Sequence, residues 1–175
     1  MVKYVGALLL AIVFVTPALA QDDYPMVELT FGYGNLGLKN FSGRHSGFAT
    51  HQTFNLSSKF AIENYLGYYG FGEDPSLGKV ELITNVFGGR FNIRAAGPVF
   101  YGTAGLGVGV LRFPQIGAGT NNAMALKLGG GVDIPINDSF AWKVDVSRMS
   151  FHFFDTWSSG ANISTGIVIK IHGGF

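Results

Sequence analysis

The chain alternates bulky apolar residues with small or polar ones along most of its length. Residues 27–34 read VELTFGYG, so apolar and aromatic side chains occupy every second position. A period of two is the repeat of a β-strand, in which successive side chains point to opposite faces. Helical spacing is hard to find after residue 21. The alternation therefore predicts an all-β fold.

Eight segments carry this pattern, at 27–34, 48–56, 60–68, 83–93, 100–110, 124–134, 140–147 and 163–172. The connectors between them are alternately long and short. The short ones are 57–59, 94–97 and 135–139, and the long ones are 39–46, 72–79, 114–121 and 155–162. Short turns at one end and longer loops at the other are typical of an up-and-down barrel in an outer membrane. We therefore predict an eight-stranded antiparallel up-and-down transmembrane β-barrel.

The short connectors also predict how neighbouring strands align. Between the second and third segments, the turn sets Phe54 opposite Ile62. Between the fourth and fifth segments, the turn sets Phe91 opposite Phe100. In both hairpins bulky residues then face bulky residues across the turn, as a closed sheet requires.

The alternation leaves open whether the apolar face lies inside a soluble, lipocalin-like barrel or outside against lipid. The polar parity is rich in Gly, Ala, Thr and Ser, which fit the narrow interior of an eight-stranded barrel. On a solvated surface these glycines would only weaken the strands. Tyr33, Phe91 and Trp142 lie near strand ends on the apolar parity, where aromatic girdles form. We therefore expect the apolar face to contact lipid.

Charged residues within the strands share the small-residue parity, which points inward in this barrel. They are four acids and four bases: Glu28, Glu63, Arg90, Lys127, Asp133, Lys143, Asp145 and Lys170. Buried charges are costly unless they are paired and hydrogen-bonded. We therefore expect a packed polar lumen plugged by ion pairs near the tight turns, with Glu28–Lys170 and Glu63–Arg90 as the leading pairs. Partly hydrated, loosely paired charges are the alternative.

The N-terminus has the pattern of a secretory signal peptide. Lys3 precedes an apolar run at 5–15, and Ala18 and Ala20 form an A-x-A cleavage site. The alternative, an N-terminal membrane anchor, is disfavoured because the run is shorter than the roughly 20 residues of a membrane helix. We expect a signal peptide at 1–20 and a barrel domain at 21–175. Without Lys3 the 12 basic residues become 11, equal to the 11 acidic ones, so charge gives no argument for nucleic-acid binding.

Several short motifs occur in a characteristic order along the chain. Residues 85–91 read NVFGGRF, residues 97–100 read GPVF, and residues 128–133 read LGGGVD. With the segments around them, they resemble the bacterial outer-membrane β-barrel domain family, which includes OmpA-like transmembrane domains and opacity-type small barrels. This resemblance implies a place in the outer membrane of a Gram-negative-type bacterium, reached through the periplasm. It also implies contact with membrane lipid and lipopolysaccharide, and we expect a monomer without a cofactor.

The last segment resembles the signal that the outer-membrane assembly machinery reads. Its polar, glycine and apolar positions fall on Ser164, Gly166, Ile169 and Ile171, and the chain ends in Phe175. The residues HGG at 172–174 separate Phe175 from the apolar alternation, so its place in the last strand stays open. The resemblance implies that this machinery is a partner of the chain.

We expect a structural or surface-interactive role without catalysis, and three alternatives remain open. The first is an adhesion or binding module that acts through its loops, with 155–162 and the aromatics Phe151, Phe153, Phe154 and Trp157 as candidates. The second is a lipid A-modifying enzyme, for which His152, Asp155, Ser158 and Ser159 are the candidates. The third is a small pore, which a lumen filled by charges disfavours.

The other histidines have simpler interpretations. His51 is expected inside the lumen as a hydrogen-bonded residue rather than a metal ligand. His45, with Lys39 and Arg44, gives the first long loop a basic character. This loop is expected to be solvated, with contact to lipopolysaccharide phosphate as the alternative. The chain has no cysteine, which excludes disulfides and thiol nucleophiles.

Overall fold

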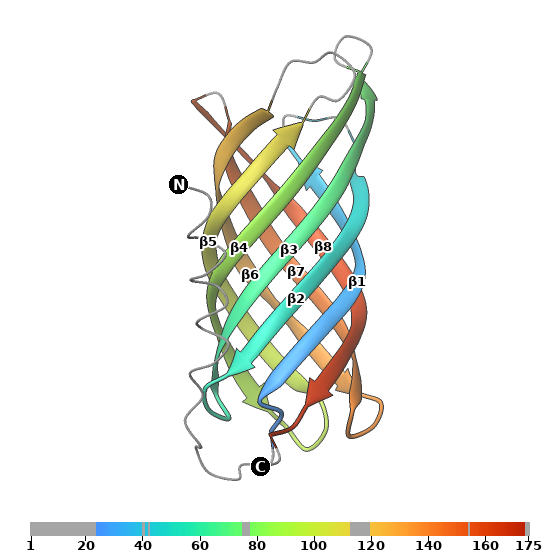
Figure 1. Cartoon of the computed structure of the whole chain (residues 1–175), viewed down its shortest axis with the longest axis vertical. Coiled ribbons are helices and arrows are strands. Elements are labelled where there is room, and N and C mark those ends of the chain that lie inside the picture. Colours follow the sequence, from blue (N-terminus) through green and yellow to red (C-terminus); the bar gives the residue numbers. More distant parts are fainter. Residues whose placement is uncertain are drawn as a thin grey trace.

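The chain forms a closed barrel of eight antiparallel strands in the computed structural model (Figure 1). The structure describes residues 24–39, 41, 43–74, 78–112, 120–153 and 155–173. The strands are β1 (Val27–Leu38), β2 (His45–Asn55), β3 (Phe60–Asp74), β4 (Gly78–Arg94), β5 (Val99–Arg112), β6 (Thr120–Pro135), β7 (Phe140–Phe153) and β8 (Thr156–Ile171). Each pairs with the next, and β1 pairs with β8 to close the wall. This confirms the predicted fold class. None of the described residues lies in a helix long and apolar enough to cross a membrane.

One of the two predicted hairpin registers is confirmed and the other is wrong. Phe54 of β2 lies opposite Ile62 of β3, as predicted. Phe91, however, lies opposite Gly102 rather than Phe100. β4 runs on to Arg94, which pairs with Val99 of β5. The four-residue turn therefore lies one residue later in the chain than predicted, and the register moves by two residues. A shift of two leaves every side chain on its predicted face.

The strands reach further toward the loop end than the sequence pattern predicts. The predicted loop at 155–162 is wrong, because β8 begins at Thr156. Asp155 lies in the turn before it, with a positive φ of 59°. Residues 156–162 read TWSSGAN and lack the apolar alternation that predicts a strand. Backbone pairing with β1 and β7 nevertheless holds them in the sheet.

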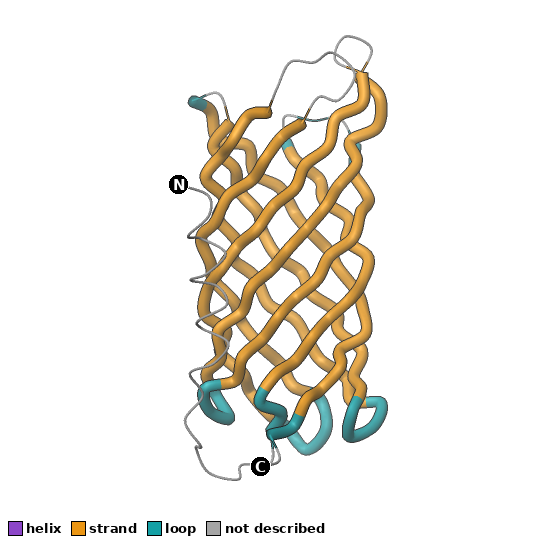
Figure 2. Tube along the Cα trace, in the orientation of Figure 1, coloured by secondary structure: helices purple, strands orange, loops and turns teal. Residues whose placement is uncertain are grey.

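The apolar parity covers the outside of the barrel. Phe48 is 73% exposed, Leu128 66% and Leu106 64%, although all three lie within strands. Water would make such a continuous apolar exterior unfavourable, whereas acyl chains match it. Figure 2 shows the three short turns together at one end of the tube, which the fold class places on the periplasmic side.

The inside of the barrel has two halves of different chemistry. The half near the tight turns is charged. The other half holds an apolar cluster of Leu36, Leu38, Phe41, Ala49, Tyr65, Tyr69, Phe71, Val80, Leu82, Val86, Leu111, Ala123, Ala125, Met149, Phe151 and Phe153. The expectation of a polar lumen throughout is therefore wrong for the outer half. There the strands rise toward the loops, and inward aliphatic and aromatic side chains fill the space between them.

Candidate functional site: the charged half of the lumen

Seven charged side chains meet inside the barrel near its periplasmic end. We call them the charged cluster: Glu28, Glu63, Arg90, Lys127, Asp133, Lys143 and Asp145. Each occupies an inward position of β1, β3, β4, β6 or β7 and is at most 4% exposed. The period of two that turns apolar side chains toward lipid turns these residues toward the barrel axis.

Arg90 of β4 lies at the centre of the charged cluster. Its Nη2 atom is 2.5 Å from Oδ2 of Asp133. Its Nη1 atom is 3.5 Å from Oε2 of Glu28 and 3.7 Å from Oε2 of Glu63. The guanidinium carbon also lies 3.9 Å from the centre of the Tyr101 ring. One guanidinium therefore connects carboxylates from three strands, and the predicted Glu63–Arg90 contact is one of these pairs.

The two buried lysines extend this network. Nζ of Lys127 lies 3.1 Å from Oε1 of Glu63 and 3.5 Å from Oδ2 of Asp145. Nζ of Lys143 lies 3.0 Å from Oδ1 of Asp133. Tyr101 donates its hydroxyl to Oδ2 of Asp145 over 3.0 Å. Each buried lysine therefore contacts at least one carboxylate, which is the condition for keeping a charge out of water.

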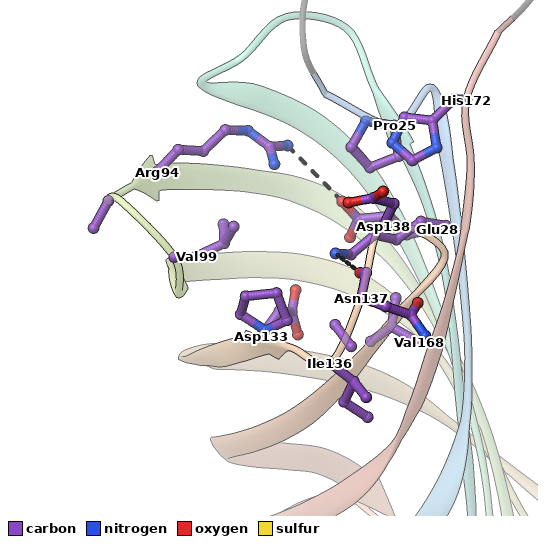
Figure 3. A pocket seen from close by; sticks show the side chains of 15 residues that line it. Pro25, Glu28, Arg94, Val99, Asp133, Ile136, Asn137, Asp138, Val168 and His172 are labelled. Carbon is purple, nitrogen blue, oxygen red and sulfur yellow. Dashed lines mark hydrogen bonds and ion pairs between the residues drawn. The ribbon is translucent and has the colours of Figure 1, made fainter.

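The predicted Glu28–Lys170 pair is not formed among the described residues. The two residues are neighbours in the register of β1 and β8, but Nζ of Lys170 donates to the backbone oxygen of Asn137 over 3.3 Å. Arg94 takes the expected place, with Nη2 3.8 Å from Oε1 of Glu28 (Figure 3). Its inward parity, shared with Arg90, was the signal that sequence reasoning missed. With Arg94, the four buried carboxylates face four cations.

Two asparagines that sequence reasoning missed, and His51, which it placed inside the lumen, complete the network. Asn55 donates from Nδ2 to Oε1 of Glu28 over 3.0 Å, and Asn92 donates to Oδ1 of Asn55 over 3.1 Å. His51 is 1% exposed, with Nδ1 3.3 Å from Oε1 of Glu63. All of them are inward positions of the alternation. An asparagine, unlike a charge, gives no sequence signal that separates a lumen partner from an ordinary strand residue.

A hydrogen-bonded layer separates the charged half from the apolar half. The hydroxyl groups of Tyr65 and Tyr69 are hydrogen-bonded to each other. Tyr69 donates to Oδ1 of Asn162 over 2.8 Å, and Nδ2 of Asn162 donates to the Tyr65 hydroxyl over 3.2 Å. The two tyrosine rings belong to the apolar cluster. The amphipathic side chains of the two tyrosines therefore connect the charged half of the lumen to the apolar half.

A cavity of about 630 Å³ lies at the periplasmic mouth of the barrel (Figure 3). Glu28 and Asp133 line it on the side of the charged cluster, and Arg94, Lys170 and His172 line it as well. Because Glu28 and Asp133 belong both to the cavity wall and to the ion-pair network, the cavity ends where the network begins. The cavity is a vestibule below a filled section of the lumen.

The residues considered for catalysis do not form a catalytic arrangement. Ser158 is 2% exposed and points inward, whereas the His152 ring lies 5.1 Å from the ring of the exposed Trp157. His152 and Ser158 thus lie on opposite faces of the wall. Ser159 is hydrogen-bonded to Ser150 over 2.8 Å, and the exposed Asp155 occupies the turn between β7 and β8. Within the described ranges there is no group of three or more residues that could hold a metal ion.

The residues considered for surface contact divide between the inside and the outside. Phe151 and Phe153 are buried in the apolar cluster, so they act as a cap of the lumen and leave Trp157, 46% exposed, on the surface. His45 is also buried, with its ring stacked 3.9 Å from that of Phe71. Arg44 donates to the side chain and, over 3.0 Å, to the backbone oxygen of Asn35. Lys39 is exposed, and Phe154 lies outside the described residues.

The proposed assembly signal lies at the seam that closes the barrel. Ser164 is 4% exposed and points inward, whereas Ile169 and Ile171 are exposed on the outside, and all pair with β1 together with Gly166. Phe175, like Ala18 and Ala20 of the predicted cleavage site, lies outside the described residues.

Comparison with known proteins identifies the fold. No protein-family model and no curated protein matches the chain. Among solved structures, Neisserial surface protein A superposes with a TM-score of 0.69 at 11% identity, covering 83% of this chain and 96% of that one. The attachment invasion locus protein of Yersinia pestis gives 0.57 at 17% identity over 83% and 99%. Outer membrane protein OprG from Pseudomonas aeruginosa gives 0.58 at 9% identity over 86% and 97%. The chain therefore has the fold of the small outer-membrane β-barrels, and its apolar exterior supports a place in the bacterial outer membrane.

Proposed function

We propose that the chain is an integral outer-membrane protein with a plugged lumen, whose role is structural or surface-interactive and does not involve catalysis. The observation that carries this proposal is the filling of the interior. The charged cluster occupies the periplasmic half and the apolar cluster the outer half. An eight-stranded barrel is only just wide enough for side chains, so filling both halves leaves no continuous path for ions.

The ion pairs make the plug resistant to opening. Separating a buried pair by removing one partner costs about 3–5 kcal/mol, because an uncompensated charge stays in a medium of low dielectric constant. Arg90 alone contacts Glu28, Glu63 and Asp133. An ion entering from the vestibule would have to displace several such contacts together.

Single-channel recording tests the plug. The wild-type barrel in a planar bilayer is expected to show no stable unit conductance. A triple variant that shortens Arg90, Tyr101 and Lys143 to Ala is expected to conduct, because these side chains meet at one level of the lumen. The matched control shortens the exposed Lys59 in the turn after β2. Stable unit steps from the wild-type barrel would refute the plugged lumen.

The absence of catalysis is supported by the opposite orientations of His152 and Ser158 in the wall. A hydroxyl nucleophile needs a base within hydrogen-bond reach. We expect cells that overexpress the protein to contain lipid A of unchanged mass, with an empty-vector strain as the reference. A lipid A species that appears only with the protein, and disappears with His152→Ala, would contradict this part of the proposal.

A surface-interactive role would need exposed side chains of the outer rim rather than a free loop at 156–162, because these residues form the first part of β8. Lys39 and Trp157 are exposed at this rim. Binding of whole cells to host or abiotic surfaces is the readout, with Lys39→Ala and Trp157→Ala as single and double variants. Unchanged binding by the double variant would leave the structural role as the better description.

A further inference from the structure

Arg148 is an exception to the charge pattern of the barrel. It follows Val144 and Val146 on the outward parity of β7 and is exposed on the outer wall. Its neighbours across the sheet are Leu128 of β6, 66% exposed, and Ala161 of β8. Among the residues that the structure describes, none forms a hydrogen bond or ion pair with the Arg148 side chain. The alternation predicts that this strand ends at residue 147, so Arg148 lay outside the predicted strand.

The position of Arg148 along β7 places it at the level of the outer leaflet. It lies eight residues above Phe140, where β7 leaves its periplasmic turn. At about 3.3 Å per residue and a tilt of about 45°, this is roughly 19 Å along the membrane normal. The apolar band of such barrels is about 25 Å tall. The backbone of Arg148 therefore lies below the outer headgroups, and its long side chain can carry the guanidinium up to them.

A shallow groove lies beside Arg148 on the same outer wall. We call it the outer groove. It has a volume of about 760 Å³ and crosses β4 to β7, and its lining includes Phe87, Ala104, Gly105, Leu106, Leu128 and Arg148. Ala104 and Gly105 are among the smallest residues of the lining and form the bottom of the groove. Phe87, Leu106 and Leu128 lie along it and are 49–66% exposed. Arg148 and Ser150 give it a polar edge.

We propose that the outer groove binds one acyl chain of lipid A, the lipid of lipopolysaccharide, and that Arg148 binds its phosphate. A lone lipid-facing arginine costs about 2–4 kcal/mol near the midplane and less toward the interface. A phosphate ligand offsets this cost, because guanidinium and phosphate form paired, charge-assisted hydrogen bonds. The level of Arg148 selects the outer leaflet, where the phosphorylated lipid is lipid A. This inference rests on the orientation of the barrel and is independent of whether the lumen conducts.

Lipid titration followed by native mass spectrometry tests the proposal. The full barrel in detergent is titrated with diphosphorylated lipid A, with dephosphorylated lipid A and with phosphatidylglycerol. Arg148→Gln removes the charge, Arg148→Lys keeps the charge without the planar fork, and Ala104→Phe fills the outer groove. Arg112→Gln, at an exposed position at the loop end of β5, is the matched control. Heat-modifiability on a gel shows that each variant is folded.

We expect one tight lipid A on the wild-type barrel. Arg148→Gln and Ala104→Phe should each weaken its binding at least about tenfold, and Arg148→Lys should weaken it less. Arg112→Gln should not change the affinity. Equal affinity of the wild type and Arg148→Gln for lipid A would overturn the proposal. Equal binding of dephosphorylated lipid A would show that Arg148 does not bind the phosphate. Equal binding of phosphatidylglycerol would show that the outer groove does not select lipid A.

Discussion

Replacing Arg90 with Met removes the guanidinium that connects three buried carboxylates while keeping most of its volume. The costs do not add, because two of the three acids keep another cation. Asp133 keeps Lys143 at 3.0 Å, and Glu63 keeps Lys127 at 3.1 Å. Glu28 keeps only Arg94 at 3.8 Å. The main consequence is thus one poorly compensated buried carboxylate, and we expect a loss of about 3–5 kcal/mol in the free energy of unfolding.

A double-mutant cycle identifies the source of this loss. If Glu28 carries the uncompensated charge, adding Glu28→Gln to Arg90→Met should restore about 1–3 kcal/mol, although Glu28→Gln alone destabilises the barrel. Urea unfolding of the barrel in lipid vesicles, followed by tryptophan fluorescence, measures both values. Arg112→Met, at an exposed position, is the control and should cost less than about 1 kcal/mol. A loss below about 1 kcal/mol for Arg90→Met, or no coupling to Glu28, would refute the reasoning.

Four further substitutions give contrasting outcomes in the same unfolding assay. Gly47→Ala should prevent stable closure of the barrel, because its Cβ would lie 1.7 Å from the backbone oxygen of Tyr68, whereas the Cβ of Gly89→Ala meets nothing within 4 Å and this variant should be nearly neutral. Equal effects of the two variants would contradict the close approach of β2 and β3. Tyr101→Phe should cost about 1.5–3 kcal/mol by removing a hydrogen bond to the buried carboxylate of Asp145, and a neutral result would mean that this bond is unimportant. Leu106→Arg should cost about 2–4 kcal/mol if its 64% exposed side chain faces lipid, and a stabilising effect would count against that environment.

The alternation of residue types was enough to predict the number of strands and the face of each side chain. Both follow from local geometry, because a strand places residues i and i+2 on one side whatever its neighbours do. The inward position of Glu63 and Lys127 could be read from the sequence because they share the parity that is rich in small residues. In the second hairpin the predicted partner of Phe91 was wrong, since it pairs with Gly102, but each side chain still lies on its predicted face of the sheet.

Properties that depend on height along the barrel could not be predicted in this way. Whether Arg94 or Lys170 reaches Glu28 depends on strand tilt and on the turn at 136–139, which binds Lys170. The apolar character of the outer half depends on inward side chains from seven strands reaching one level. Arg148 could be recognised as lipid-facing only once β7 was seen to continue to Phe153.

The central claim is that the apolar wall touches acyl chains while the charges lie within the cylinder. Lipids that carry a photoactivated carbene precursor in the acyl chain test it on the unmodified protein, with residue-level mass spectrometry as the readout. We expect carbene adducts on Leu106 and Ile167, which are 64% and 45% exposed, and none on Glu63 or Lys143, which are at most 2% exposed. Adducts on Glu63 and Lys143 without adducts on Leu106 and Ile167 would mean that the barrel is inside out.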